Sequence, residues 1–366
     1  MGGNAPRVAD RREARKRLQT VLERVEARVP VVVSRRDAER ALGALQVTGD
    51  LWEVFRLSRA PIRFLCAFLQ ELIAQGLVQL EGVHLRLSPE GRGWVGALGI
   101  PPAREVACSR CGGRGVELGA LGEEVMGRFR VIARRRPPAL QAFDQGYVTE
   151  ETTLSRVAFA LDRGDVQGKE VFVVGDDDLV SIALALTRQP RRVVVVDVDE
   201  RIVGFIREVA RREGLDMVEA HVYDVRSPLP EAWRARFDTF FTDPTESLRG
   251  FQAFMERGVA ALQGAGSAGY FGLTHGESSL EKWARIQRVL LDLGAVITDI
   301  RDGFNVYDNW DYMETMRAWQ WLPVRTRPEH LWYFSALFRI ELLRTPSVEN
   351  LPLEGNLFED EEAATT

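Results

Sequence analysis

The stretch Val171-Phe172-Val173-Val174-Gly175-Asp176-Asp177-Asp178-Leu179-Val180-Ser181 decides the fold. Its apolar half predicts a buried β-strand, and the residues that follow predict a tight turn and the start of a helix. In α/β folds that bind dinucleotides, this turn usually carries several glycines, which let the backbone approach a phosphate. Here one glycine is followed by three carboxylates, which would repel a phosphate. The turn therefore predicts a site for a cation.

Strands and helices alternate from residue 169 onward. Short apolar runs, mostly β-branched, predict strands at 170–174, 193–197, 217–222, 237–241 and 267–273. Helices are expected between them, at 179–188, 200–213, 246–263 and 278–293. This alternation predicts a parallel, doubly wound sheet with right-handed crossovers. Two further strands, 295–301 and 332–343, lack a crossover helix and predict an antiparallel hairpin. The fold class expected for 169–345 is α/β, a class I methyltransferase-like, Rossmann-type sheet.

Residues 1–93 are expected to form a separate domain. Helices predicted at 10–29, 37–45, 49–55 and 60–75 precede a hairpin of 77–80 with 84–87, an arrangement that resembles a winged helix. The domain carries 16 basic and 11 acidic residues, against 32 and 42 in the rest of the chain. DNA binding through Arg56, Arg59 and Arg63 would use this charge. The excess is modest, however, so a scaffold or dimerisation module is favoured and a nucleic-acid partner is not expected.

Residues 94–168 predict a connector followed by a helical segment. The connector contains Cys108-Ser-Arg-Cys111, which has the spacing of half a zinc ribbon. Its second half is missing, so zinc at Cys108 and Cys111 would need a partner chain or distant ligands. No tightly bound cofactor is therefore expected. Residues 346–366 are polar and end in an acidic run, which predicts a mobile tail.

Membrane and export classes are not expected. No run in the sequence approaches the roughly 20 apolar residues that a membrane span needs. Three cysteines cannot form a disulfide framework, so the reducing cytoplasm is the expected location.

Carboxylates gather after the predicted parallel strands, at the edge where open α/β sheets bind ligands. They are Asp176, Asp177, Asp178, Asp197, Asp199, Asp224, Asp243, Glu246 and Glu277. After the second strand, Asp197 or Asp199 suits ribose hydroxyls, although an aspartate there is also a common helix N-cap. After the third strand, Asp224 suits an adenine amino group. The remaining carboxylates, with little histidine nearby, favour a polycation over a metal. Several would hold ammonium groups while one takes a proton from an attacking amine.

At these residues the chain resembles the N(4)-bis(aminopropyl)spermidine synthase family, the branched-chain polyamine synthases of thermophiles. The most specific shared motif is Gly175-Asp176-Asp177-Asp178, and the Asp243-Pro244 turn is a weaker one. The winged-helix-like front, the Cys-x-x-Cys connector and the segment Pro328-Glu329-His330-Leu331-Trp332 extend the resemblance over most of the chain.

The resemblance implies an aminopropyltransferase. Decarboxylated S-adenosylmethionine would be the co-substrate, spermidine or a related polyamine the acceptor, and a homodimer the assembly. Asp176 or Asp243 would take the proton. The expected polyamine contacts are Asp177, Asp178, Gln145, Tyr147 and Glu246. The expected donor contacts are Gly175, Asp197 or Asp199, and Asp224.

Three alternatives stay open at this point. An S-adenosylmethionine-dependent methyltransferase could act on an amine or a nucleic-acid base, although the three aspartates would repel a nucleic-acid backbone. A linear-polyamine synthase would use the same chemistry. A winged-helix regulator could sense a small molecule through the back domain without catalysis.

Overall fold

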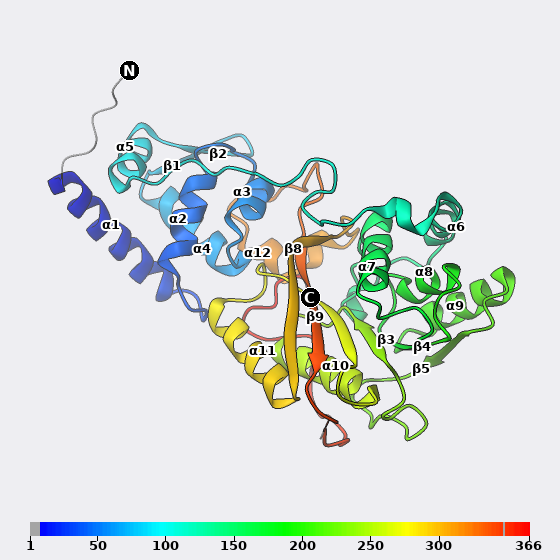
Figure 1. Cartoon of the computed structure of the whole chain (residues 1–366). Helices are drawn as coiled ribbons and strands as arrows, with labels where there is room; N and C mark the ends of the chain where they lie inside the picture. The colour runs from blue at the N-terminus through cyan, green and yellow to red at the C-terminus, as the bar shows by residue number, and fades with distance from the viewer. Residues whose placement is uncertain (1–7, 347) are drawn as a thin grey trace.

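The computed structural model describes residues 8–346 and 348–366 (Figure 1). In its N-terminal part, helices α1 (Val8–Glu26), α2 (Arg35–Ala44), α3 (Leu51–Ser58) and α4 (Ile62–Ala74) precede the hairpin of β1 (Val78–Glu81) and β2 (His84–Leu87). Helix α5 (Pro89–Leu98), which the sequence patterns did not predict, follows the hairpin. The predicted helices and hairpin are therefore present, and the name winged helix stays a prediction.

The arginines considered for DNA binding contact other parts of the same chain. Arg56 pairs with Glu105 at 2.6 Å, and Arg59 pairs with Asp302. Arg63 donates to the backbone oxygen of Glu361 at 2.8 Å. These contacts use the guanidinium groups to join the N-terminal part to the connector and to the C-terminal half. They favour the scaffold interpretation over DNA binding.

The C-terminal part is built on one seven-stranded sheet. Its strands are β3 (Glu170–Val174), β4 (Arg192–Asp197), β5 (Val218–Val222), β6 (Thr239–Thr242), β7 (Ala268–Leu273), β8 (Ala295–Val306) and β9 (Phe334–Leu342). They lie in the order β5-β4-β3-β6-β7-β9-β8. All pairs from β5 to β7 are parallel, whereas β9 pairs antiparallel with both β7 and β8. This topology confirms the predicted class I methyltransferase-like sheet.

Both faces of the sheet are covered (Figure 1). On one face, Val171 and Val173 of β3 pack with α6 (Glu123–Ala133), α7 (Glu150–Asp162), α8 (Val180–Leu186) and α9 (Glu200–Glu213). On the other face, Phe172 and Val174 pack with α10 (Leu248–Ala261) and α11 (Leu280–Asp292). Alternate residues of β3 therefore enter two different cores, which is why its sequence is a continuous apolar run.

The strand order reverses beside β3. The chain moves outward through β4 and β5, then crosses to β6 on the other side of β3. Such a reversal leaves a crevice at the carboxyl ends of the central strands. The turn after β3, with its three aspartates, therefore opens onto the ligand-binding edge.

Three short helices complete the connections. They are the 3-10 helices at Leu118–Leu121 and Gln141–Phe143 and a third at Met313–Thr315, and α12 (Arg317–Trp321) follows the last of them. In the described part of the chain, no helix combines the length and apolar character needed to cross a membrane.

The C-terminal segment differs from the mobile tail that its composition predicts. The backbone oxygen of Leu357 accepts a hydrogen bond from Thr245 Oγ1 at 2.9 Å, and Asp360 pairs with Lys282 at 2.8 Å. The amide of Ala364 donates to Glu277 at 2.5 Å. These partners are buried donors and a buried carboxylate, which need partners of their own once water is excluded. The tail is therefore packed against the part of the chain that forms the seven-stranded sheet.

Candidate active site

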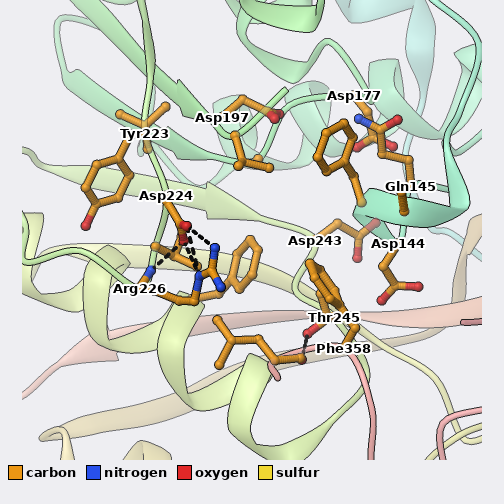
Figure 2. A pocket seen from close by; sticks show the side chains of 18 of the residues that line it. Asp144, Gln145, Asp177, Asp197, Tyr223, Asp224, Arg226, Asp243, Thr245 and Phe358 are labelled. Carbon is orange, nitrogen blue, oxygen red and sulfur yellow. Dashed lines mark hydrogen bonds and ion pairs between the residues drawn. The ribbon is translucent and has the colours of Figure 1, made fainter. Parts of the chain in front are cut away.

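A cavity of about 540 Å³ lies at the carboxyl edge of the sheet (Figure 2). Six of the predicted site residues line it, namely Gln145, Gly175, Asp177, Asp197, Asp224 and Asp243. Val196, Tyr223 and Phe254 add apolar and aromatic surface, and Leu357 and Phe358 of the tail close part of the wall. A volume of this size is typical of small-molecule sites.

A narrower branch of about 50 Å³ continues from this cavity. Both share Asp144, Gln145, Asp177 and Asp243, so the two spaces meet at these side chains. The branch is also lined by one further carboxylate and four aromatic side chains, namely Glu246, Tyr307, Trp310, Tyr312 and Tyr333. One end of the site is thus spacious and mostly apolar, and the other is narrow, acidic and aromatic.

Four of the predicted site residues line neither space. Asp176 and Asp178 flank the cavity-lining Asp177 but point elsewhere, Asp199 caps α9, and Tyr147 packs beneath an arginine.

The turn after β3 separates its three aspartates. Gly175 has φ 71°, which glycine adopts without strain. The Asp176 carboxylate accepts hydrogen bonds from the amide and hydroxyl of Ser181 at the start of α8. Asp178 accepts from the amide of Val148 at 2.7 Å. Of the three, only Asp177 lines the cavity and its branch.

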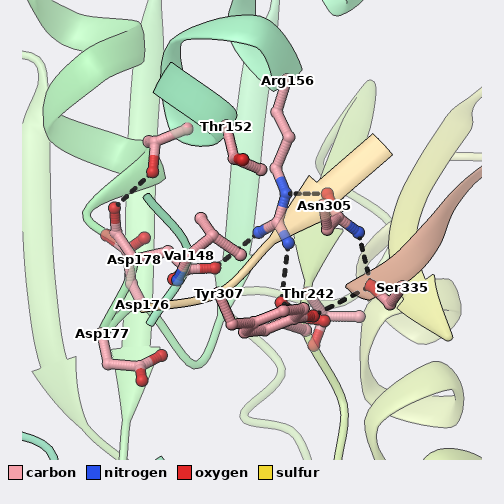
Figure 3. Close-up of polar contacts among 12 residues, drawn as sticks. Val148, Thr152, Arg156, Asp176, Asp177, Asp178, Thr242, Asn305, Tyr307 and Ser335 are labelled. Carbon is pink, nitrogen blue, oxygen red and sulfur yellow. Dashed lines mark hydrogen bonds and ion pairs between the residues drawn. The ribbon is translucent and has the colours of Figure 1, made fainter. Parts of the chain in front are cut away.

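Arg156 of α7 is the central buried cation (Figure 3). Its side chain is 4% exposed. Nη1 donates to Asp178 at 2.6 Å, Nη2 to Asp243 at 2.7 Å and Nε to Asn305 at 2.9 Å. Arg156 was not predicted from the sequence, because nothing marks a helical residue so far before the turn as a partner of its aspartates. Arg156 therefore fixes one carboxylate from the loop after β3 and one from the loop after β6.

Burial shapes the acidity of the site. Burial raises the pKa of Asp243, and the charge of Arg156 opposes that rise. Burial also raises the pKa of Asp177, Asp144 and Glu246 well above their usual range, and neighbouring carboxylates add to it. Oε2 of Glu246 is buried without a hydrogen-bond partner among the described residues. The charges of Arg136 at Asp177 and of Lys282 at Glu246 oppose this rise only in part, so an ammonium ligand would further stabilise the charged forms.

Asp197 and Asp199 take different positions after β4. Asp197 lines the cavity while accepting from the amides of Asp176 and Asp199, each at 2.8 Å. Asp199 is 2% exposed, caps α9, and pairs with Arg201 at 2.6 Å. Gln145 Nε2 also donates to Asp199, at 2.9 Å. Of the two candidates for a ribose, only Asp197 therefore faces the cavity.

Asp224 lines the far end of the cavity and pairs with Arg226 at 2.5 Å (Figure 2). The hydrogen bond from Arg226 lowers the pKa of this carboxylate. Both side chains are partly exposed, so solvent and ligands can reach the pair.

Of the two residues predicted in the loop before α7, Gln145 lines the cavity and Tyr147 does not. Gln145 lines both spaces, held by its bond to Asp199 and by the amide of Leu140, which donates to its Oε1 at 2.9 Å. The guanidinium group of Arg136 instead lies over the ring of Tyr147, with its central carbon 3.5 Å from the ring centroid. Tyr147 therefore supports the loop from outside the cavity.

The aromatic residues of the branch were also missed. Tyr307, Trp310 and Tyr312 follow β8 in a short segment rich in aromatic and acidic residues, and Tyr333 precedes β9. That composition, in the loop joining the edge strand β8 to its neighbour β9, was the available signal. Tyr333 donates to the buried Glu277 at 2.6 Å, so the sequence-predicted fifth-strand carboxylate supports the branch without lining it.

The cysteines form no recognisable metal centre. Cys66 is buried, Cys108 is exposed and Cys111 is partly exposed. Within residues 8–346 and 348–366, no group of three or more His, Cys, Asp or Glu side chains is arranged to hold a metal ion.

Comparisons with known proteins agree with the predicted resemblance. A family model described as the branched-chain polyamine synthase A C-terminal domain matches residues 124–365. The N(4)-bis(aminopropyl)spermidine synthase of Thermus thermophilus is 53% identical over 350 residues, covering 94% of this chain and 98% of that protein. Its counterpart in Thermococcus kodakarensis is 43% identical over 352 residues, covering 95% and 100%. A crystal structure of the Thermus thermophilus branched-chain polyamine synthase, in complex with N4-aminopropylspermidine and 5'-methylthioadenosine, is similar with a TM-score of 0.89 at 53% identity, covering 97% of this chain and 99% of that one. The chain therefore belongs to the branched-chain polyamine synthase family.

Proposed function

We propose that this protein transfers aminopropyl groups from decarboxylated S-adenosylmethionine to the secondary amine of spermidine. Two successive transfers would give N(4)-bis(aminopropyl)spermidine, with methylthioadenosine released at each. The observation that carries the proposal is the junction of the two spaces at Asp177 and Asp243. It would bring a nucleoside-bearing donor and a polycationic acceptor together at the same carboxylates.

The larger cavity suits the donor. Asp197 would accept hydrogen bonds from the ribose hydroxyls, and Asp224 would accept one from the adenine amino group after exchanging its bond to Arg226. Val196, Tyr223 and Phe254 offer apolar surface for the base. The sulfonium and its aminopropyl chain would then extend toward the junction.

The narrow branch suits the acceptor. Asp144, Asp177 and Glu246 offer carboxylates for primary ammonium groups, each a charge-assisted contact. Trp310 and Tyr333 offer rings to the carbon chain and to cationic nitrogen. A phosphate or nucleic-acid backbone would meet only negative charge here, which disfavours the nucleic-acid methyltransferase alternative.

The reaction needs positioning and one base. The secondary ammonium of spermidine first gives its proton to a carboxylate, for which we propose Asp243. The nitrogen lone pair then attacks the methylene carbon bound to sulfur. The carbon–sulfur bond breaks, its electrons return to sulfur, and neutral methylthioadenosine leaves. The product is a tertiary ammonium, which loses its proton before the second attack, and that attack yields a quaternary nitrogen.

Asp243 is preferred over Asp176 as the base because it lines both spaces, whereas Asp176 hydrogen-bonds to Ser181 outside them. Removing a general base costs typically 10²- to 10⁴-fold in rate. We therefore expect Asp243→Asn to lower kcat by about two orders of magnitude or more. Asp162→Asn is the matched control, since that carboxylate lies 68% exposed at the end of α7.

A single assay tests the proposal. The protein is incubated with spermidine and either decarboxylated or intact S-adenosylmethionine, while methylthioadenosine and polyamine masses are followed. Mass gains of one and then two aminopropyl groups, only with the decarboxylated donor, are expected. Methyl transfer from the intact donor would favour the methyltransferase alternative, and extension at a terminal amine would favour a linear-polyamine synthase.

Three further parts of the proposal rest on the sequence. The homodimer is tested by light scattering during size-exclusion chromatography. The cytoplasmic location is tested by fractionation of cells that express the protein. The absence of a nucleic-acid partner is tested by titration with duplex DNA at low salt, where binding to phosphates is strongest.

A further inference from the structure

Two buried hydroxyl groups connect the Asp243 carboxylate to a second cavity. The hydroxyl of Tyr307 donates to Oδ2 of Asp243 at 2.9 Å. The same hydroxyl lies 3.0 Å from Oγ of Ser335, and either oxygen can be the donor in that bond. Figure 3 shows Tyr307 and Ser335 joined in this way. Tyr307 is 5% exposed and Ser335 is 2% exposed, so bulk water does not surround either group.

The two residues line different spaces. Tyr307 lines the acidic branch of the active site. Ser335 lines a separate cavity of about 160 Å³ between α3, the connector and the ends of β7 and β9. Three exposed side chains rim that second cavity, Arg59, Glu105 and Asp302, so it is open to solvent. The hydrogen-bonded chain therefore begins at the junction and ends at a residue that lines a solvent-accessible space.

The proposed reaction creates a need for such a path. Each acceptor nitrogen must lose a proton before it attacks, and substrates that fill the junction displace the water that could carry the proton away. The neighbouring carboxylates Asp177 and Glu246 would be engaged with ammonium groups. A base that serves two successive transfers must release its proton between them.

We propose that Tyr307 and Ser335 relay the proton from Asp243 to the second cavity, an inference that rests on the proposed function. The protonated Asp243 carboxyl gives its proton to the Tyr307 oxygen while the Tyr307 hydroxyl proton passes to Ser335. The Ser335 hydroxyl proton passes to water in the second cavity. One proton enters and one leaves, and both hydroxyls end neutral with their hydrogen bonds reversed.

Hydrogen bonds from neighbouring side chains fix the positions of the groups in the relay. Nδ2 of Asn305 donates to Ser335 Oγ at 2.8 Å, which leaves the serine proton free to point toward Tyr307 or the cavity. Oδ1 of the same asparagine accepts from Arg156, whose other nitrogen holds Asp243. Arg156 thus holds the Asp243 end of the hydrogen-bonded relay, and Asn305 holds the Ser335 end.

Charged groups face the relay at each end. At the Asp243 end, they are Arg156 from α7, Asp178 and Asp177 from the turn after β3, Asp144 from the loop before α7, and Glu246 from the loop after β6. At the Ser335 end, they are Arg56, Arg59, Glu105, His275 and Asp302. Burial lowers the pKa of His275 to about 4, so this imidazole stays neutral throughout the range in which the amines titrate.

The test compares Ser335→Ala with Ser335→Thr, which keeps a hydroxyl, in steady-state assays between about pH 6 and about pH 10. Ser335→Ala should lower kcat near neutrality by about tenfold or more, within the range for proton-transfer steps, and leave KM for spermidine unchanged. The deficit should shrink as pH approaches about 10, because an alkylammonium is then increasingly deprotonated in solution. Ser335→Thr should follow the wild-type profile.

A second measurement covers the case in which Ser335→Ala folds poorly. Tyr307→Phe keeps the ring and removes the hydroxyl, and it should show the same pH-dependent deficit. For the wild type, kcat in mixtures of light and heavy water should curve, as expected for several protons in flight, and should become linear in both variants.

The outcomes separate the relay from the proposed function. Absence of turnover by the wild type would overturn the proposed function. Turnover by the wild type together with an unchanged Ser335→Ala profile would overturn the relay alone. A loss of equal size at every pH would show that the hydroxyls only position Asp243, which also overturns the relay.

Discussion

Replacing Arg156 with methionine should expose how much the buried ion triad contributes to stability. The guanidinium is 4% exposed and contacts Asp178 at 2.6 Å, Asp243 at 2.7 Å and Asn305 at 2.9 Å. Methionine has a similar length but neither charge nor donors, so two carboxylates would be left without their counter-charge. Breaking a buried pair in this way costs about 3–5 kcal/mol in the free energy of unfolding. Native domains have about 5–15 kcal/mol, so the variant should fold but with a small margin.

The loss should depend on pH in a defined direction. Burial already raises the pKa of Asp243, and Arg156 opposes the rise. Without the arginine, this pKa should rise further in the folded state, which then binds the proton more tightly than the unfolded chain does. Stability of the variant therefore falls as pH rises from the usual carboxyl pKa of about 3.9 through the raised folded value. The cost relative to wild type should be greater at about pH 8 than at about pH 5.

Urea denaturation followed by circular dichroism at both pH values measures this cost. Arg163→Met is the matched control, because Arg163 lies at the end of the same helix, is 31% exposed, and pairs with Asp299 at 3.0 Å. An exposed pair of this kind contributes about 1 kcal/mol or less. Equal losses in the two variants, or a loss for Arg156→Met that does not grow with pH, would refute the reasoning.

Two substitution pairs test other features of the site. Asp197→Asn should weaken methylthioadenosine binding by about tenfold, the equivalent of one hydrogen bond, whereas Asp199→Asn should have a smaller effect because its carboxylate faces Arg201; calorimetric titration decides, and the reverse order would return the ribose role to Asp199. Gly272→Ala should lower kcat strongly because the new Cβ would lie 2.2 Å from Oδ1 of Asp243. Gly204→Ala should leave kcat unchanged, because beyond its chain neighbours and its own helix backbone no described atom lies within 4 Å of the new Cβ. Full activity in Gly272→Ala would show that the Asp243 carboxylate can move without cost.

The sheet was predictable because its physics is local. A strand buried on both faces must be apolar at every position, and Val171–Val174 meet that condition. The alternation with helices then leaves a parallel sheet as the natural arrangement. The antiparallel β8–β9 pair was predictable from the missing crossover helix. Only the predicted ends of the strands were inexact. Strand β8, for example, extends to Val306 through two register irregularities that no residue pattern marked.

The orientation of the three aspartates after β3 was not predictable. Their order in the sequence is fixed, but their directions depend on backbone angles at Gly175 and at Leu179, which has φ 57°. Those angles place Asp177 at the cavity while Asp176 turns to Ser181. The partner of Asp178 lies on α7, so no local pattern reveals it. A motif can therefore locate a site while leaving open which of its members faces the ligand.

The packing of the C-terminal tail could not be predicted from its composition. An acidic, polar segment has too little apolar surface to pack for its own sake. Here it meets specific buried partners, including Lys282, which is 4% exposed and pairs with Asp360 of the tail. Composition describes the segment alone, whereas packing depends on the surface that it meets.

The carboxylates of this site divide into two groups by their partners. Asp178 and Asp243 share the single positive charge of Arg156, and Asp199 pairs with Arg201, so each of them has an arginine partner within the fold. Asp144, Asp177 and Glu246 line the branch with pKa values raised by burial and by one another. A cationic ligand would stabilise the second group most, because Arg136 and Lys282 offset the raised pKa values of Asp177 and Glu246 only in part. The same sequence feature, an aspartate after a strand, thus has different surroundings at different positions. Asp178 and Asp199 pair with arginines, whereas Asp177 lines the branch beside other buried carboxylates.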